Sequence, residues 1–184
     1  RELHSQRRRQ RQMCIRDSRD TWGTNLYQQI NWWAPVSNVE EKNTMIFYPD
    51  YFDVPVKNTT STWDLNIYLA NRKKGDFSYP SAPQLKEDLP SNIKKIPVTI
   101  KPGEILCFSG AHLHSSSKEK SENTRISFEI RTICENDLNS SAQAPNVDCD
   151  LQWKFPKIFK KINDNSPLKI CLLYTSDAAD DVAS

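Results

Sequence analysis

Short apolar runs separated by turn-forming residues are the feature that most limits what this chain can fold into. Between positions 19 and 170 the runs are rich in aromatic and β-branched residues and end at Pro, Gly, Asn or Ser, which is typical of strands rather than helices. Several short strands separated by turn-forming residues favour a β-sandwich or jelly roll. The predicted strands are Asn25–Pro35, Thr44–Tyr48, Trp63–Leu69, Pro97–Ile100, Glu104–Ser109 and Arg125–Ile133.

The last predicted strand alternates in polarity. Ile126, Phe128 and Ile130 fall on one side of it, and the polar residues between them fall on the other. Because successive side chains of a strand point to opposite faces, this strand belongs to a sheet whose two faces are solvated differently. Lys101–Glu104 (KPGE) predicts a tight turn between two strands, with Pro and Gly at its centre.

A long polar segment, Asn71–Lys95, separates two groups of predicted strands. It is rich in Lys, Pro, Ser and Asp and has no helical or strand periodicity. Surface segments of this length without secondary structure are often lids over a functional site. We therefore expect a surface insertion here and a candidate lid.

The two ends of the chain are related in a way that no fold explains. A DNA sequence that encodes Arg8–Ser18 (RRQRQMCIRDS) also encodes CLLYTSDAAD, which is Cys171–Asp180, when its complementary strand is translated. The string resembles a transposase-type sequencing adapter. We expect residues 1–18 and 171–184 to be adapter-derived and disordered, and residues 19–170 to form one domain that is truncated at its N-terminus.

Setting the two ends aside changes what the composition implies. The chain has 184 residues and a net charge of +2, and residues 1–18 contain six arginines. Such a basic arm is typical of nucleic-acid binding, which is not expected once the arm is excluded.

The cysteines outside the two ends are Cys107, Cys134 and Cys149, an odd number without CxxC spacing, which favours a reducing compartment. Without a membrane-length apolar run or a secretory signal, we expect a cytoplasmic protein with no membrane contact.

The cluster Gly110-Ala111-His112-Leu113-His114 follows a predicted strand. Histidine is the commonest metal ligand, and residues two apart on an extended chain share a face, so both imidazoles could line one cavity. A pair of ordinary surface or core histidines is the alternative. Asp20 is a further candidate, although an Asp before Thr-Trp is also typical of a turn or a helix cap.

The order of three residues brings these candidates together. Asp20 is followed by His114 and then, eleven positions later, by Arg125, an arrangement that resembles the phytanoyl-CoA dioxygenase-like family of iron(II)- and 2-oxoglutarate-dependent dioxygenases. The stretch RDTWGTNLYQQINWWAPV is similar to the one that carries the family's proximal motif, and GEIL leading into FSG is similar to the turn and strand before its distal histidine. The resemblance implies a mainly β fold, a double-stranded β-helix (jelly roll, cupin-like) that is incomplete at the N-terminus.

The resemblance also implies a role for each candidate residue. Asp20 and His114 are the expected catalytic residues and metal ligands, two members of a facial triad that leaves three positions of Fe(II) open. Arg125 is expected to bind the far carboxylate of 2-oxoglutarate with a forked pair of hydrogen bonds, assisted by Ser116. The family has histidine where this chain has Ser18, so we expect the chain as written to be inactive.

Several assignments stay open at this stage. Gln29 and Asn31 lie on the polar side of the first predicted strand and could orient 2-oxoglutarate or the substrate, and Arg131 is a possible second cation. The expected reaction is hydroxylation of a small organic substrate by dioxygen, with the substrate and the oligomeric state undetermined. One alternative is a cupin-type metal enzyme that uses His112, His114 and Glu119, and another is a non-catalytic jelly-roll module whose aromatic residues stack on a carbohydrate.

Overall fold

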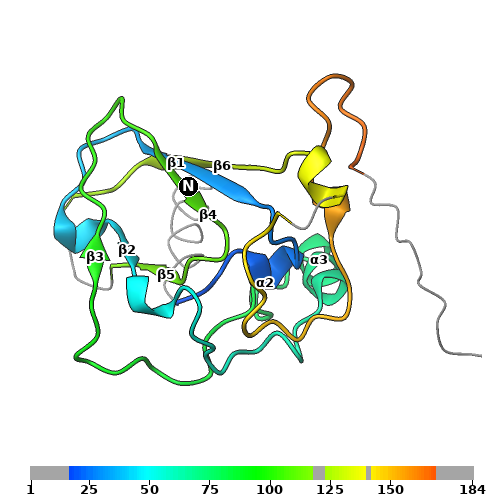
Figure 1. Cartoon of the computed structure of the whole chain (residues 1–184), viewed down its shortest axis with the longest axis horizontal. Coiled ribbons are helices and arrows are strands. Elements are labelled where there is room, and N and C mark those ends of the chain that lie inside the picture. The colour runs from blue at the N-terminus through cyan, green and yellow to red at the C-terminus, as the bar shows by residue number, and fades with distance from the viewer. Residues whose placement is uncertain (1–16, 118–122, 140–141, 169–184) are drawn as a thin grey trace, which may run out of the picture.

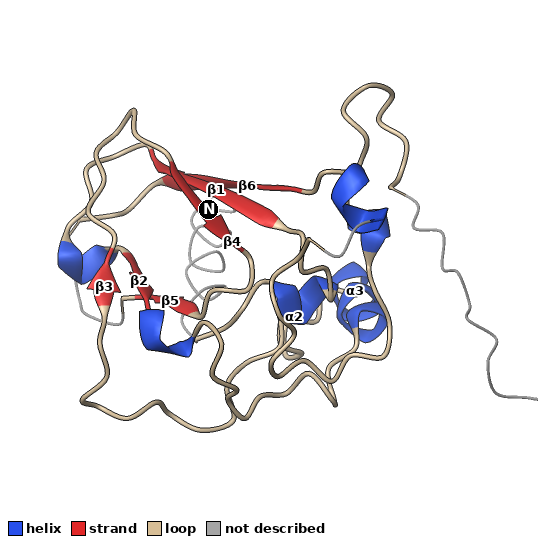
Figure 2. Ribbon diagram, viewed as in Figure 1, coloured by secondary structure: helices blue, strands red, loops and turns tan. Residues whose placement is uncertain are grey.

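Two small antiparallel sheets form the centre of the protein (Figures 1 and 2). The structure is a computed structural model that describes residues 17–117, 123–139 and 142–168. One sheet has the strand order β4-β1-β6, and the other has the order β3-β2-β5. The strands are β1 (Ile30–Pro35), β2 (Met45–Phe47), β3 (Ile96–Pro97), β4 (Leu106–Ser109), β5 (His114–Ser116) and β6 (Ser127–Thr132).

Short helical segments lie around the sheets. Helices α2 (Thr21–Thr24) and α3 (Leu65–Lys73) lie together at one end of the molecule (Figure 1). Four 3-10 turns complete the described structure: Glu41–Asn43, Pro49–Tyr51, Asn136–Asn139 and Pro156–Ile158. Within the described ranges, no helix combines the length and the apolar character that crossing a membrane requires.

Apolar side chains pack between the two sheets. Trp33 and Phe108 from one sheet form a buried cluster with Met45 from the other and with Val98, which follows β3. The rings of Phe47 and Phe108 meet edge to face, with centroids 5.0 Å apart, a favoured arrangement for aromatic pairs. A second buried cluster lies beside α2 and consists of Trp22, Tyr27, Tyr48, Leu113, Cys149 and Leu151.

The predicted β-rich fold is confirmed, and its sheets are small and open. Strands form within the predicted segments Asn25–Pro35, Thr44–Tyr48, Glu104–Ser109 and Arg125–Ile133, each shorter than predicted. Ile96–Pro97 overlaps the predicted Pro97–Ile100. The three-residue strand β5 was not predicted, because its pairing with β2 decides its conformation and its own sequence does not.

The strand predicted over Trp63–Leu69 is wrong, since α3 occupies this segment. Asp64 caps the helix: its carboxylate accepts hydrogen bonds from the backbone N–H groups of Asn66 and Ile67, which have no partner inside the helix. Leu, Ala, Arg and Lys in the following turns are good helix formers. The helix continues to Lys73, so the segment expected as an unstructured insertion over Asn71–Lys95 begins inside it.

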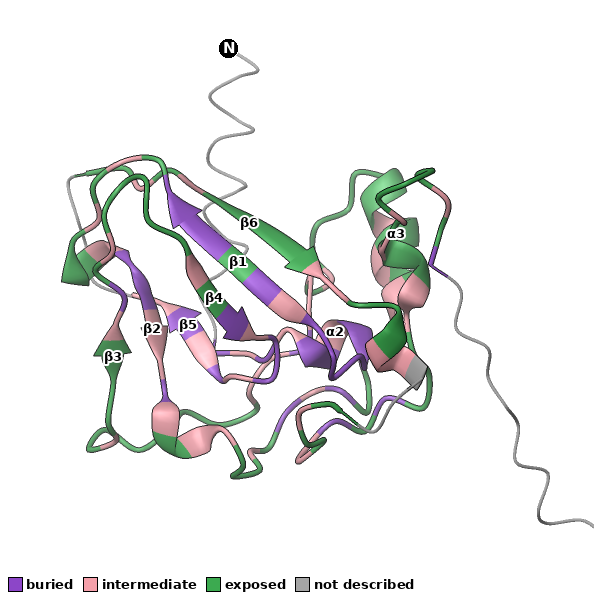
Figure 3. Cartoon of the chain, turned by 45° about the horizontal axis from the view of Figure 1, so that its top comes forward, coloured by how far each residue is buried: buried purple, intermediate pink, exposed green. Residues whose placement is uncertain are grey.

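The predicted alternation of the last strand is present, but its apolar side faces away from the other sheet. Ile126, Phe128 and Ile130 are 47–56% exposed, and β6 is accordingly coloured as exposed in Figure 3. The polar side chains of β6 point instead toward the space between the sheets, where Arg131 contacts Asp20. This side of the strand therefore carries charged side chains, and Arg131 is still 42% exposed there.

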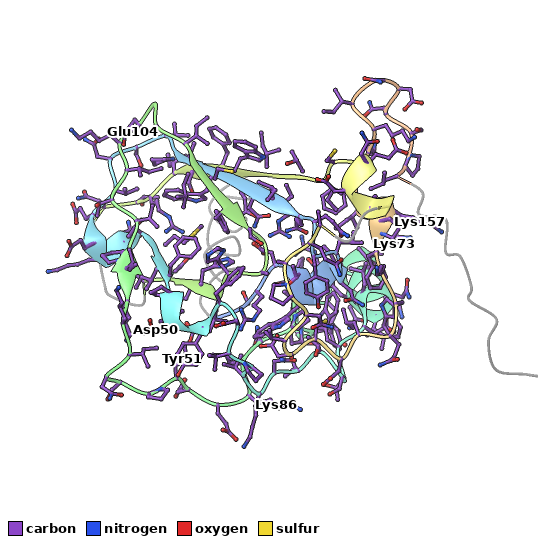
Figure 4. The ribbon with its side chains drawn as sticks, in the orientation of Figure 1. Asp50, Tyr51, Lys73, Lys86, Glu104 and Lys157 are labelled. Atoms are coloured by element: carbon purple, nitrogen blue, oxygen red, sulfur yellow. The ribbon has the colours of Figure 1, made fainter. Side chains whose placement is uncertain are left out.

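The predicted turn at Lys101–Glu104 is confirmed. The backbone N–H of Glu104 donates to the carbonyl of Lys101 at 3.0 Å, and Gly103 has a φ of +96°, which side chains other than glycine rarely adopt. Figure 4 shows Glu104 at the rim of the molecule, far from Lys73 at the end of α3. This turn connects β3 to β4 and so joins the two sheets.

A buried ion pair ties the segment before α2 to the second half of the chain. Arg19 and Asp148 lie 3.1 Å apart, with side chains only 2% and 4% exposed. The Arg19 guanidinium also donates to three backbone carbonyls, those of Phe52, Val54 and Ala111. Asp148 accepts a hydrogen bond from the Trp22 indole at 2.7 Å and another from the backbone of Val56. Each charge thus has several hydrogen bonds, as burial of an ion pair requires.

We predict that Asp148→Ala strongly destabilises the fold, because it leaves the Arg19 guanidinium buried without a carboxylate. Removal of one partner of a buried ion pair costs about 3–5 kcal/mol. Urea unfolding measures the change. The matched control is Glu87→Gln, which breaks the exposed pair between Lys57 and Glu87 and should leave the unfolding midpoint unchanged. Equal midpoints for both variants would show that Arg19 is not held by Asp148.

Candidate functional site

Backbone pairing places Ser18 directly beside His114. The two residues form an isolated antiparallel bridge in which each backbone N–H donates to the other's carbonyl, at 3.0 and 3.1 Å. On the other side of β5, Phe47 of β2 is the register partner of His114. Residues paired directly across antiparallel strands point to the same face. Ser18, His114 and Phe47 therefore form one row of side chains.

The facing sheet presents a second row, formed by Phe108, Asn31 and Arg131. Asn31 in β1 is the register partner of Phe108 in β4 and of Arg131 in β6. The two rows come into contact through Phe108 of one and His114 of the other, whose ring centroids are 5.6 Å apart. A site between the rows can therefore draw side chains from both sheets.

Asp20 lies between the two rows and contacts both. Its Oδ2 is 3.6 Å from Nε2 of His114, and the same oxygen accepts a hydrogen bond from the side-chain amide of Asn31. Its Oδ1 accepts from Arg131 at 2.8 Å. The side chains of Asp20 and His114 are 10% and 12% exposed, so the pair is nearly shielded from water but still reachable.

The contact between Asp20 and His114 brings together two side-chain types that bind transition metals. A carboxylate oxygen and an imidazole nitrogen suit iron(II), manganese(II) and zinc(II) alike. The His114 ring is oriented by its other nitrogen, Nδ1, which lies 3.0 Å from the carbonyl of His112, a common partner for a metal-binding histidine. Among the described residues, no group of three His, Cys, Asp or Glu side chains comes together.

Arg125 and Ser116 also lie close together, as the resemblance implies. The guanidinium of Arg125 donates to the Ser116 hydroxyl at 3.2 Å and lies over the Trp33 ring, 5.8 Å from its centroid. Ser116 is two residues after His114 on β5, which places it on the same face about 7 Å further along the strand. The guanidinium is therefore held beside the row that contains His114.

Gln29 lies deeper than expected. It is 0% exposed, and its amide nitrogen donates to the Asn31 side-chain oxygen at 2.8 Å. Gln29 thus reaches the site through Asn31, which itself contacts Asp20. The two residues share the polar side of one strand in the sequence, but only Asn31 contacts Asp20.

The two histidines have different surroundings. His112 packs against the rings of Phe52 and Phe47, with centroids 4.5 and 5.7 Å away. Burial is the largest cause that holds the pKa of His112 below its ordinary value, so its neutral form is favoured. Glu119, the third residue of the cupin alternative, lies outside the described residues.

Tyr48 anchors the segments on both sides of the bridge. Its hydroxyl donates to the Asp17 carboxylate at 2.9 Å and lies 2.9 Å from the Ser115 hydroxyl. Asp17 and Ser115 are neighbours of Ser18 and His114 in sequence, and both are buried. Asp17 and Ser18, expected to belong to a disordered end, therefore occupy defined positions within the fold.

No protein-family model and no curated protein matches this chain.

We predict that ionisation of Tyr48 destabilises the protein in alkali. Burial, the largest cause, and the Asp17 carboxylate raise its pKa from 10.0 to about 12, whereas the Ser115 hydroxyl lowers it. The unfolded chain then loses this proton before the folded protein does, so stability present below pH 10 is lost as the pH rises toward 12. Urea unfolding at several pH values should show a shallower decline for Tyr48→Phe. An identical decline in both proteins would contradict the assignment.

Proposed function

We propose that this domain is a non-haem iron(II)- and 2-oxoglutarate-dependent dioxygenase that hydroxylates a small organic substrate. The observation that carries the proposal is the contact between Asp20 and His114, together with the contact of Arg125 with Ser116 further along β5. These are the residues to which the resemblance assigns the metal and the cosubstrate. Asp20 and His114 are 94 positions apart in the sequence, and Ser116 and Arg125 are 9 positions apart. The proximity of each pair is therefore a result of folding.

The residues present fit iron(II) as two of its three protein ligands. Asp20 Oδ2 and His114 Nε2 face each other in a nearly buried position, and imidazole and carboxylate are the donors of the facial triad in oxygenases of this kind. The third ligand in the family's pattern is a histidine at position 18. Because Ser18 is paired directly with His114 and shares its face, a histidine there would point toward the same space.

Ser18 is therefore a specific defect in an otherwise suitable site. A neutral hydroxyl is a poor ligand for iron(II) compared with an imidazole. The same residue ends the segment that resembles an adapter. We infer that the parent protein has histidine at this position and that the chain as written binds iron weakly.

Iron(II) bound at this site supplies the activation of dioxygen, which is coupled to oxidative decarboxylation of 2-oxoglutarate. The residues of this chain bind, orient and shield. The Arg125 guanidinium, fixed by Ser116 and by the Trp33 ring, offers paired donors to the far carboxylate of the cosubstrate. Phe47 and Phe108 line the other side of His114 and exclude water, which favours productive coupling over side reactions.

The proposal extends to the fold. Two facing sheets, with Asp20 and His114 between them and Arg131 of β6 turned toward Asp20, support a double-stranded β-helix. Cupins share this architecture in outline, so the fold alone does not separate the two classes of enzyme. The contact between Asp20 and His114 supports the dioxygenase, in which both residues are metal ligands.

We predict that Ser18→His gains 2-oxoglutarate turnover. The chain as written should release little or no succinate, and the substituted chain should release succinate in an iron-dependent manner. Adding Asp20→Ala to the substituted chain should abolish the gain, since the two imidazoles, at positions 18 and 114, are then the only ligands left. Robust succinate release by the unmodified chain would overturn the argument about Ser18.

The cupin alternative is tested by His112→Ala in the Ser18→His chain. His112 stacks on Phe52 rather than meeting Asp20, so we predict that the substitution leaves iron binding in place, whereas His114→Ala removes it. Isothermal titration with iron(II) under anaerobic conditions measures both variants. Equal loss of binding in the two would favour the cupin ligand set.

A further inference from the structure

Three polar side chains lie completely inside the protein beside Asp20. Thr24, Gln29 and Asn31 are each 0–1% exposed. Burying an amide or a hydroxyl is unfavourable unless its hydrogen-bonding groups find partners. These three side chains form a series of hydrogen bonds with one another, and the last bond goes to the carboxylate of Asp20.

The series has a single direction. The Thr24 hydroxyl donates to Oε1 of Gln29 at 3.2 Å, Nε2 of Gln29 donates to Oδ1 of Asn31 at 2.8 Å, and Nδ2 of Asn31 donates to Oδ2 of Asp20. The backbone N–H of Leu26 donates to the Thr24 hydroxyl at 3.3 Å and begins the series. We call these three side chains, Thr24, Gln29 and Asn31, the amide relay.

The chemistry of its two ends determines this direction. An ionised carboxylate only accepts hydrogen bonds, so Asn31 must turn its nitrogen toward Asp20 and its oxygen toward Gln29. Gln29 must then donate to Asn31 and accept from Thr24. At the other end, the backbone N–H of Leu26 can only donate, which agrees with the same order. Successive bonds aligned in this way polarise and strengthen one another.

Packing holds the middle of the relay in place. A Cβ atom at Gly110 would lie 2.9 Å from Nε2 of Gln29, closer than real contacts allow, so the glycine makes room for the amide. The backbones of Gly110 and Gln29 are also joined, since the Gly110 N–H donates to the Gln29 carbonyl at 3.0 Å. Gln29 therefore has little freedom to choose another rotamer.

We propose that Gln29 and Asn31 are positioning residues that set the orientation of the Asp20 carboxylate for metal binding. The inference rests on the proposed function for the metal, although the relay itself is independent of it. Asn31 binds Oδ2, the oxygen that lies nearest to His114, while Arg131 binds Oδ1 from the partly exposed side. Two donors on different oxygens hold the plane of the carboxylate. Gln29 touches neither the metal position nor Asp20 and acts through Asn31.

The first test needs no metal. Side-chain amide NMR signals of Gln29 and Asn31 are compared in the chain as written and in its Asp20→Ala variant. We expect the Asn31 signals to shift and the Gln29 signals to shift as well, although Gln29 does not contact Asp20. Gln29 signals that remain unchanged while those of Asn31 move would overturn the relay.

The second test measures the affinity of the Ser18→His chain for cobalt(II) by visible absorption. Gln29→Glu removes the donor to Asn31 at nearly constant shape, and Thr24→Val removes the first side-chain link with less disturbance. We expect Gln29→Glu to weaken cobalt(II) binding by up to about 10-fold, the lower end of the effect of losing a direct partner of a metal ligand, because Gln29 acts through Asn31. Thr24→Val should weaken it less.

The control is Thr44→Val, which removes another fully buried hydroxyl whose bond goes to the carbonyl of Val98. It should lower the unfolding midpoint without changing the cobalt(II) affinity. Unchanged affinity in both folded relay variants would overturn the positioning role. A folded Ser18→His chain that binds no cobalt(II) would overturn the proposed function instead, and the amide signals would still decide whether the relay exists.

Discussion

The buried ion pair between Arg19 and Asp148 is the interaction on which the arrangement of the site depends. In sequence, Arg19 lies between Ser18, which pairs with the backbone of His114, and Asp20, which contacts the His114 ring. The Arg19 guanidinium donates hydrogen bonds to the carbonyls of Phe52 and Ala111, which are distant in sequence. Such a pair is weak evidence for stability by itself, because its desolvation is costly. Its value lies in geometry: it fixes the backbone of Ser18 and Asp20 against the loop that leads to β5.

Once this segment is fixed, the two sheets supply the rest of the site as rows of paired residues. Pairing across β5 aligns Ser18, His114 and Phe47, and pairing across β1 aligns Phe108, Asn31 and Arg131. Asp20 joins the rows. The charged residues Glu129 and Arg131 of β6 lie on the side of the strand that faces Asp20, while Phe128 and Ile130 face outward.

Sequence reasoning predicts some of this structure and misses other parts for identifiable reasons. The runs around Trp33 and Phe108 are rich in aromatic and β-branched residues and end at turn formers, so the sequence predicts β1 and β4. The segment Trp63–Leu69 has aromatic and β-branched residues typical of a strand, but Asp64 within it caps a helix whose last turn lies beyond this run. Asp20, His114 and Arg125 were candidates through a resemblance in order and spacing, whereas the roles of Asn31 and Tyr48 depend on contacts between segments that no local pattern encodes.

The central claim is that Asp20 and His114 jointly hold a metal ion once histidine stands at position 18. Anomalous diffraction from crystals of the Ser18→His chain grown with cobalt(II) locates the ion directly. The account predicts one strong peak within coordination distance of Asp20 Oδ2, His114 Nε2 and the introduced imidazole. A peak at His112, or at a site that does not include Asp20, would contradict it.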